Sequence, residues 1–182
     1  MREDNEATAA HSGSIVLAVR PIEADAFRPY GDVVRRGEPQ SANDGFALKR
    51  DGQFPFASAH LPGPEAATLT VSAFAVEERP EPVLIAGVER HPHSPQAFMP
   101  LDEGKAMILV ACPREDGGID EGTLAAFVTE PGEGFVYKPG IWHSGVTGYG
   151  GPARFVAVQW TGSDADCVTR DLDRTVRITV TS

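Results

Sequence analysis

The stretch Glu89-Arg90-His91-Pro92-His93-Ser94-Pro95-Gln96 brings two imidazoles, a carboxylate and a carboxamide together within eight residues. Apolar segments at 83–85 and 107–110 flank it, and their composition is typical of strands. Since successive side chains of a strand point to opposite faces, we expect Glu89, His91 and His93 to project to one side. The stretch therefore predicts a polar site carried by a β-sheet.

A second cluster of polar and aromatic residues occupies positions 134–143. Pro139 and Gly140 mark a turn, and Tyr137 precedes it. His143 follows the turn directly after Trp142. The two clusters could therefore enclose one site that contains imidazole groups from both.

Length and composition predict one globular domain. The chain has 182 residues, of which 41% are hydrophobic and 23% are charged, and a chain of this size can bury a core without disulfide bonds. Residues 1–14 are small and polar and are predicted to form a disordered tail, so that the domain spans 15–182. No apolar run approaches the roughly 20 residues of a membrane helix, so we expect no membrane partner.

The charge and the cysteines limit the partners and the compartment. A net charge of −10 argues against nucleic acid as a partner, since binding to phosphates depends on Lys and Arg. The N-terminal segment lacks the apolar core of a signal peptide, and Cys112 and Cys167 belong to no CxxC motif. We therefore expect a cytoplasmic protein in a reducing compartment.

Short apolar segments separated by Gly, Pro and Asp recur along the chain without a long helical period. This pattern predicts an all-β protein, an antiparallel sandwich or barrel. Short helical turns are expected at 23–31 and 120–126, a turn at 41–45 and a loop at 51–65. Strands are expected at 15–19, 32–34, 46–50, 68–76, 83–91, 107–112, 124–129, 135–138, 142–147, 155–160 and, at the end of the chain, 176–181.

The β-rich C-terminal segment 176–180 is predicted to form an exposed sheet edge. An exposed edge invites pairing with a strand of another chain. We therefore expect a homodimer that forms through this segment.

The two clusters resemble the sequence motifs of the cupin superfamily. Glu89, His91, Gln96 and Gly104 take the places of the first motif, and the stretch from Pro139 to His143 matches the second. The resemblance implies a jelly-roll barrel, also called a double-stranded β-helix, with both motifs facing its interior.

A closer resemblance is to the ureidoglycolate lyases of purine catabolism and allantoin degradation. It rests on Glu-Arg-His-Pro at 89–92, Gln-Ala-Phe-Met-Pro at 96–100, and Tyr137 ahead of Trp142 and His143. Further matches are the stretch 27–33, Asn-Asp-Gly at 43–45 and Asp-Cys at 166–167, the last of which follows the final barrel strand in the family. The resemblance covers roughly residues 15–170.

The resemblance implies cleavage of ureidoglycolate, the carbinolamide of glyoxylate and urea, into those two products. Such a reaction needs a base for the carbinol hydroxyl, a proton for the departing nitrogen and donors or cations for the carboxylate. By this resemblance, Glu89, His91 and His143 would be catalytic. The same three residues and Gln96, with His93 as a further candidate ligand, would bind a divalent metal such as Ni, Mn, Zn or Fe. The small anionic substrate would be oriented by Asn43, Lys49, Tyr137 and Gln159.

Some positions depart from the family pattern and keep alternatives open. Lys49 stands where the family has an arginine, which keeps the charge but loses the bidentate fork. Ala75 stands where another arginine is expected, and His93 where histidine is unusual. The alternatives are a divergent metal-dependent cupin, such as an isomerase, dioxygenase or amidohydrolase, and a cupin that binds a small molecule without catalysis.

Overall fold

The computed structural model describes residues 13–34, 38–49, 68–162 and 166–179. As predicted, the described part is mostly β-structure, and its helical pieces are short: α1 (Ala24–Phe27), η1 (Asn43–Gly45) and η2 (Glu121–Thr123). The strands are β1 (Ile15–Pro21), β2 (Gly31–Val34), β3 (Gln40–Ala42), β4 (Ala47–Lys49), β5 (Thr68–Val76), β6 (Val83–Arg90), β7 (Gln96–Pro100), β8 (Lys105–Ala111), β9 (Ala125–Val128), β10 (Gly134–Tyr137), β11 (Trp142–His143), β12 (Thr147–Tyr149), β13 (Ala153–Thr161) and β14 (Val168–Thr179).

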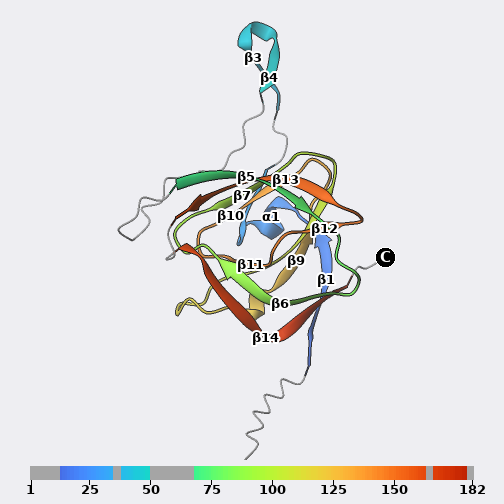
Figure 1. The fold of residues 1–182 in the computed structure, drawn as a ribbon, viewed down its shortest axis with the longest axis vertical. Coiled ribbons are helices and arrows are strands. Elements are labelled where there is room, and N and C mark those ends of the chain that lie inside the picture. The colour runs from blue at the N-terminus through green and yellow to red at the C-terminus, as the bar shows by residue number, and fades with distance from the viewer. Residues whose placement is uncertain (1–12, 35–37, 50–67, 163–165, 180–182) are drawn as a thin grey trace, which may run out of the picture.

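Two sheets form the body of the protein (Figure 1). The larger sheet has the order β11-β6-β14-β1-β9-β8-β12, and β11 also pairs with β8, so the strands from β11 to β8 close into a ring. The smaller sheet has the order β2-β10-β7-β13-β5, and β3 and β4 pair only with each other. This closed, two-sheet arrangement agrees with the predicted jelly-roll fold.

Alternation along the ring strands creates two separate apolar cores. On β8, Met107 and Leu109 enter a core inside the ring, whereas Ile108 and Val110 enter the layer between the two sheets. The ring core also contains Val19, Val83, Ile85, Val88, Ala126, Trp142, Val176 and Ile178. The inter-sheet layer also contains Phe27, Tyr30, Phe98, Phe127, Phe135, Tyr137 and Phe155. Full burial of one large apolar side chain contributes roughly 1.5–3 kcal/mol, so both cores stabilise the fold.

Two predictions about topology are wrong. The larger sheet is mixed rather than antiparallel, because β1 pairs in parallel with both β14 and β9. The C-terminal segment is not an exposed edge, because β14 begins at Val168 and lies between β6 and β1. A register shift between Asp171 and Val176 interrupts the pairing of β14 with β6. That irregularity and the polar composition of the preceding residues hide the first half of the strand in the sequence.

Other boundaries differ in ways that affect the site. The strand predicted to reach position 91 ends at Arg90, since Pro92 and Pro95 follow and cannot donate to a strand ladder. The strand β7 was not predicted, and the strand expected at 142–147 is two strands, β11 and β12. The segment at 166–167 precedes β14 rather than following the last strand. The predicted loop at 51–65 and nearly all of the predicted tail lie outside the described residues.

Candidate functional site

Three predicted residues, Glu89, His91 and His143, converge at one end of the inter-sheet layer. Glu89 on β6 and His143 on β11 are directly paired in the ring, and His143 Nε2 lies 3.6 Å from Glu89 Oε1. His91 follows the end of β6, and its ring centroid lies 5.5 Å from that of His143. The potential ligand atoms of all three lie within 4.8 Å of one another. The structure therefore brings residues of the two sequence clusters together.

Backbone carbonyl groups determine which nitrogen of each imidazole carries a proton. His91 Nδ1 lies 2.7 Å from the carbonyl oxygen of Asp166, and His143 Nδ1 lies 3.0 Å from that of Ile141. A carbonyl oxygen only accepts, so Nδ1 donates in both rings and Nε2 of each neutral ring keeps its lone pair. Both Nε2 atoms are buried without a hydrogen-bond partner. The site therefore presents two unpaired basic nitrogens to whatever it binds.

Tyr137 and two glutamines complete the wall of the site. The Tyr137 ring stacks on that of His143 at 4.2 Å between centroids, and its buried hydroxyl has no hydrogen-bond partner. Burial, with a smaller contribution from the charge of Glu89, raises the pKa of Tyr137 well above its ordinary value. Gln96 on β7 donates through Nε2 to Gln159 on β13, and this leaves Gln96 Oε1 buried and unpaired. Tyr137 thus keeps a hydroxyl proton that it can donate, and Gln96 keeps an unpaired acceptor.

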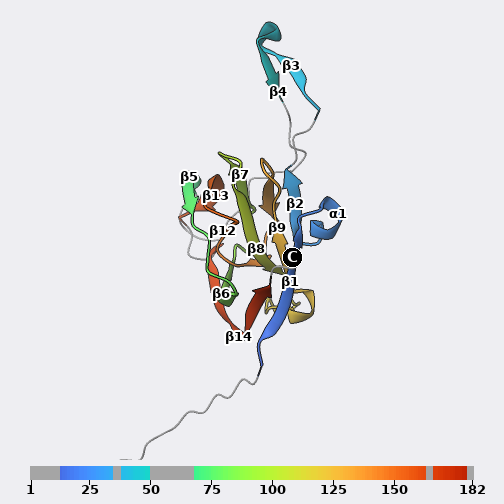
Figure 2. The same ribbon diagram turned by 90° about the vertical axis from the view of Figure 1, so that its right-hand side faces the viewer.

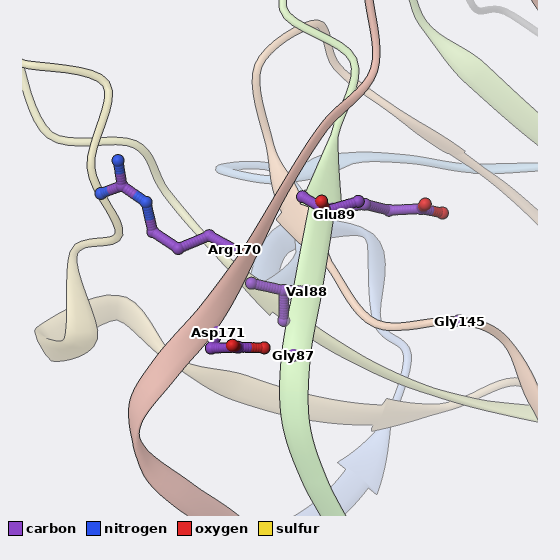
Figure 3. Close-up of a pocket in the computed structure, with 7 residues that line it drawn as sticks. Gly87, Val88, Glu89, Gly145, Arg170 and Asp171 are labelled. Atoms are coloured by element: carbon purple, nitrogen blue, oxygen red, sulfur yellow. The ribbon is translucent and has the colours of Figure 1, made fainter.

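The carboxylate of Glu89 is the anionic group of the site. When the His143 ring carries a second proton at Nε2, its hydrogen bond and charge lower the pKa of Glu89, although burial acts in the opposite direction. Figure 3 shows that Glu89 leaves β6 on the side away from Arg170. The guanidinium groups of Arg90 and Arg170 lie over the Trp142 ring, at 4.9 and 5.8 Å from its centroid. These two arginines therefore stack on a residue of the ring core rather than neutralise Glu89.

Two cavities adjoin this group, one at His91 and Gln159 and the other at Glu89. One of about 480 Å³ is lined by His91, Gln159, Trp160, Thr161, Gly162, Asp166 and Cys167. The other, of about 400 Å³ and drawn in Figure 3, is lined by Gly87, Val88, Glu89, Gly145, Thr169, Arg170 and Asp171. Volumes of this size are typical of sites for small molecules.

The remaining predicted residues lie elsewhere. His93 is exposed in the turn after β6 and does not join the group formed by Glu89, His91 and His143, because the strand ends before it. Asn43 and the backbone of Lys49 belong to the β3–β4 hairpin, which projects from the body, so the structure does not bring them to the site of their own chain (Figures 1 and 2). Ala75 is exposed on β5, beside Arg154 of β13.

Asp166 is a contributor that sequence reasoning missed. It is buried, its carbonyl oxygen accepts from His91, and its carboxylate accepts from the backbone N–H of His93 at 2.7 Å and from the hydroxyl of Ser94. These bonds fasten the turn that carries His91 to the start of β14. The sequence indicated Asp166 only as part of the Asp-Cys match at 166–167, and the residues beside it give no sign that it is buried.

The donor set fits a divalent metal ion. Two unprotonated imidazole nitrogens and one ionised carboxylate oxygen are the ligands that transition metals such as zinc accept in proteins. The carbonyl groups that hold each Nδ1–H orient the rings in the way common for metal-binding histidines. Glu89, His91 and His143 could therefore hold a metal ion.

Comparison with known proteins gives a consistent result. A model of the ureidoglycolate lyase family matches residues 14–179. The chain is 33% identical over 152 residues to a ureidoglycolate lyase of Mesorhizobium japonicum, covering 82% of this chain and 89% of the relative. It is 34% identical over 151 residues to ureidoglycolate lyase 2 of Rhizobium meliloti, covering 82% and 88%.

A solved 3,4-ketoisomerase from Helicobacter canadensis is also similar, at 10% identity and a TM-score of 0.44, covering 76% of this chain and 89% of that one. This likeness is too low to support a statement about activity. The family match, by contrast, extends from before β1 to the end of β14. The chain belongs to the ureidoglycolate lyase family.

Proposed function

We propose that this protein cleaves ureidoglycolate to glyoxylate and urea, with the chemistry carried out by the groups at the end of the inter-sheet layer. The observation that carries the proposal is the set of unpaired buried atoms: Nε2 of His91 and His143, the hydroxyl of Tyr137 and Oε1 of Gln96. A buried polar atom without a partner costs roughly 1–3 kcal/mol. Substrate groups that pair with these atoms would offset that cost.

The chemistry of each group indicates what it binds. Gln96 Oε1 is an acceptor and suits an N–H group of the ureido end of the substrate. The Tyr137 hydroxyl keeps its proton because its pKa is raised, so it can donate to an oxygen of the substrate. The pairing of Gln96 with Gln159 fixes the amide so that its oxygen remains free. These groups would hold the carbinol carbon beside the imidazoles.

Proton transfer is assigned to His143. Its Nε2 lone pair takes the proton of the carbinol hydroxyl, the carbon–oxygen double bond of glyoxylate forms, and the carbon–nitrogen bond breaks. The same proton then goes to the departing nitrogen, so that urea leaves intact. Glu89, 3.6 Å away and with a lowered pKa, stabilises the imidazolium ion that exists between the two transfers.

A metal ion belongs to a second form of the proposal, because the Nε2 lone pair of His143 cannot hold a metal ion and take a proton at the same time. Glu89, His91 and His143 would hold a divalent ion of Ni, Mn, Zn or Fe, which would supply Lewis acidity toward the carbinol oxygen and charge for the substrate carboxylate. Arg90 and Arg170 stack on Trp142, so neither provides that charge. Gln96 is bonded to Gln159 and is assigned to the substrate rather than to the metal.

The compartment also belongs to the proposal. The structure describes no helix that is long and apolar enough to cross a membrane. Both cysteines are free, Cys112 half-buried and Cys167 exposed. Free thiols are typical of a reducing compartment, which supports the cytoplasm as the place of this reaction.

The test is product analysis with the purified protein and ureidoglycolate, in which urea, glyoxylate and ammonia are measured separately. We expect urea and glyoxylate in equal amounts and no ammonia above the uncatalysed background. Parallel reactions after chelation, and after the return of each candidate metal, identify the ion that the site uses. Ammonia in place of urea would indicate an amidohydrolase, and no product with any of the metals would refute the proposal.

A further inference from the structure

Trp160 on β13 carries a buried polar atom to which the proposed reaction assigns no role. Its indole nitrogen, Nε1, is buried without a hydrogen-bond partner among the described residues, although the residue as a whole is only half-buried. An indole N–H donates and does not accept, so the group that meets it has to be an acceptor. A buried donor that stays unpaired costs free energy, and a ligand oxygen bonded to it would offset that cost.

The position of Trp160 in its sheet places it beside the site. β13 lies between β7 and β5 (Figure 1), and its pairing with β7 ends at Gln159, opposite Gln96, the first residue of β7. Trp160 is therefore paired with Leu69 of β5 but with no residue of β7. The cavity of about 480 Å³ lies at this open corner of the sheet, and its wall contains both Trp160 and His91.

Two other polar side chains of this wall already have partners. The hydroxyl of Thr161 is hydrogen-bonded to that of Thr70. The two carboxylate oxygens of Asp166 each accept one hydrogen bond, from the backbone N–H of His93 and from the hydroxyl of Ser94. These groups are satisfied within the protein, whereas the indole N–H in the same wall is not.

The orientation of the substrate in the proposed reaction leaves its carboxylate for Trp160. Gln96 is assigned to the ureido end, and its hydrogen-bond partner Gln159 lines the cavity next to Trp160. Consecutive residues of a strand point to opposite faces, so the cavity extends around the open corner from the face of Gln159 to that of Trp160. The ureido group and the carboxylate are both attached to the carbinol carbon. A substrate whose ureido end meets Gln96 can therefore direct its carboxylate toward Trp160.

The described residues that line this cavity supply no cation for a carboxylate, since none of them is Lys or Arg. The guanidinium groups of Arg90 and Arg170 stack on Trp142 instead. Glu89, which would repel a carboxylate, lines the other cavity. In such surroundings an anionic oxygen is stabilised by neutral donors, which bind a charged acceptor about twice as strongly as a neutral one.

We propose that Trp160 binds the carboxylate of the substrate through its indole N–H and so favours acids over neutral analogues. This assignment rests on the proposed function, because it concerns the same site. Trp160 takes no part in the transfer of protons. Its loss should therefore act mainly on KM and much less on kcat.

The chain contains two tryptophans, and each gives one indole signal in a proton–nitrogen-15 NMR spectrum of the full chain. Trp142 donates to the carbonyl oxygen of Gly118 and is the internal control. The probe is ureidoacetate, which lacks the carbinol hydroxyl and is not cleaved, and ureidoacetamide is its neutral counterpart. We expect ureidoacetate to move the Trp160 signal downfield, as a new hydrogen bond does, and to leave the Trp142 signal in place. Ureidoacetamide should move the Trp160 signal much less.

Trp160→Phe keeps an aromatic ring, removes the donor and identifies which of the two signals belongs to Trp160. The dissociation constant for ureidoacetate should rise about tenfold to a hundredfold, as expected for the loss of one hydrogen bond to a charged group. The dissociation constant for ureidoacetamide should change little. An equal loss of affinity for the acid and the amide would overturn the proposal, because it would show that Trp160 acts through packing alone.

Failure of this proposal can be told apart from failure of the proposed function. Cleavage of ureidoglycolate by a protein whose Trp160 signal ureidoacetate does not move would overturn the role of Trp160 and leave the lyase activity standing. A Trp160 signal that ureidoacetate moves, in a protein that releases neither urea nor glyoxylate, would support the carboxylate contact and refute the activity. A Trp160 signal that urea moves and glyoxylate does not would assign the indole to the ureido end, which also overturns the proposal.

Discussion

Trp142 and His143 are neighbours on β11, and both are buried, yet their side chains lie in two regions that treat buried polar atoms differently. Trp142 lies in the ring core, and its Nε1 donates to the carbonyl oxygen of Gly118 at 3.2 Å. His143 faces the inter-sheet layer, where its Nε2 has no hydrogen-bond partner. The Trp142 side chain buries its one polar atom with a hydrogen-bond partner, whereas the His143 side chain leaves Nε2 available for a ligand.

The difference indicates where stability and function reside in this fold. The ring core is stabilised by apolar burial, and the indole N–H of Trp142 that it buries is paired. The end of the inter-sheet layer keeps unpaired atoms on His91, Gln96 and Tyr137 as well, which lowers stability and prepares a binding site. Substitutions in the ring core should therefore mainly lower the free energy of unfolding, whereas substitutions at the end of the inter-sheet layer should mainly lower activity.

The largest expected effect is on folding, from Trp142→Ala. Removing this fully buried side chain should lower the free energy of unfolding by about 3–5 kcal/mol, through lost burial and the cavity left behind. Denaturant titration measures the change. A loss below about 1 kcal/mol would show that the ring core is not what stabilises the protein.

The largest expected effect on activity is from His143→Ala, which should lower kcat/KM for ureidoglycolate by about a hundredfold or more. The loss of stability should be smaller than for Trp142→Ala, because the variant also removes an unpaired buried nitrogen. His93→Ala is the control, since His93 is exposed, and it should retain full activity. Equal losses from both histidine variants would contradict the assignment of the site.

Tyr137→Phe should separate the effect on stability from the effect on activity most clearly. The variant removes a buried hydroxyl that has no partner, so the free energy of unfolding should stay the same or rise by about 1 kcal/mol. Activity should fall about tenfold, since one donor to the substrate is lost. A variant that is both less stable and fully active would show that the Tyr137 hydroxyl stabilises the fold and does not contribute to activity.

The smallest effect is expected outside both regions, at Asp102. Arg154, together with the backbone N–H of Gly104, lowers the pKa of Asp102. The resulting stabilisation is present above the ordinary aspartate pKa of 3.8 and is lost as pH falls through the lower value in the folded protein. Between these values the unfolding free energy of the unchanged protein should fall more steeply with decreasing pH than that of Asp102→Asn. Parallel curves would mean that the pair with Arg154 does not form in solution.

Local sequence was enough to predict much of the fold and the convergence of Glu89, His91 and His143. Alternating apolar segments indicated the β-class, and polar residues beside Pro-Gly and Pro-x-Ser-Pro turns indicated Glu89, His91 and His143. These signals can be read from short stretches of sequence, because a side chain at the end of a strand is positioned by that strand. His93 failed as a ligand candidate because the strand stops before it, which the alternation rule does not foresee.

Long-range pairing accounts for what the sequence did not predict. The neighbours of β14 come from positions 83–90 and 15–18, so its place inside the larger sheet cannot be read from its own composition. Asp166 acts on His91 across the same kind of contact, 75 positions away. The β3–β4 hairpin was predicted only as a turn and a short strand, because the sequence of these residues does not indicate how far the hairpin projects from the sheets.

The most direct test of the central claim is nitrogen-15 NMR of the histidine rings in metal-free protein, at a pH where the rings are neutral. The structure predicts that His91 and His143 are protonated at Nδ1 and unprotonated at Nε2. Addition of a ureido acid that cannot be cleaved should shift both Nε2 resonances and leave those of His93 unchanged. A proton on Nε2 of either ring, or a shift confined to His93, would contradict the claim that these unpaired nitrogens receive the substrate.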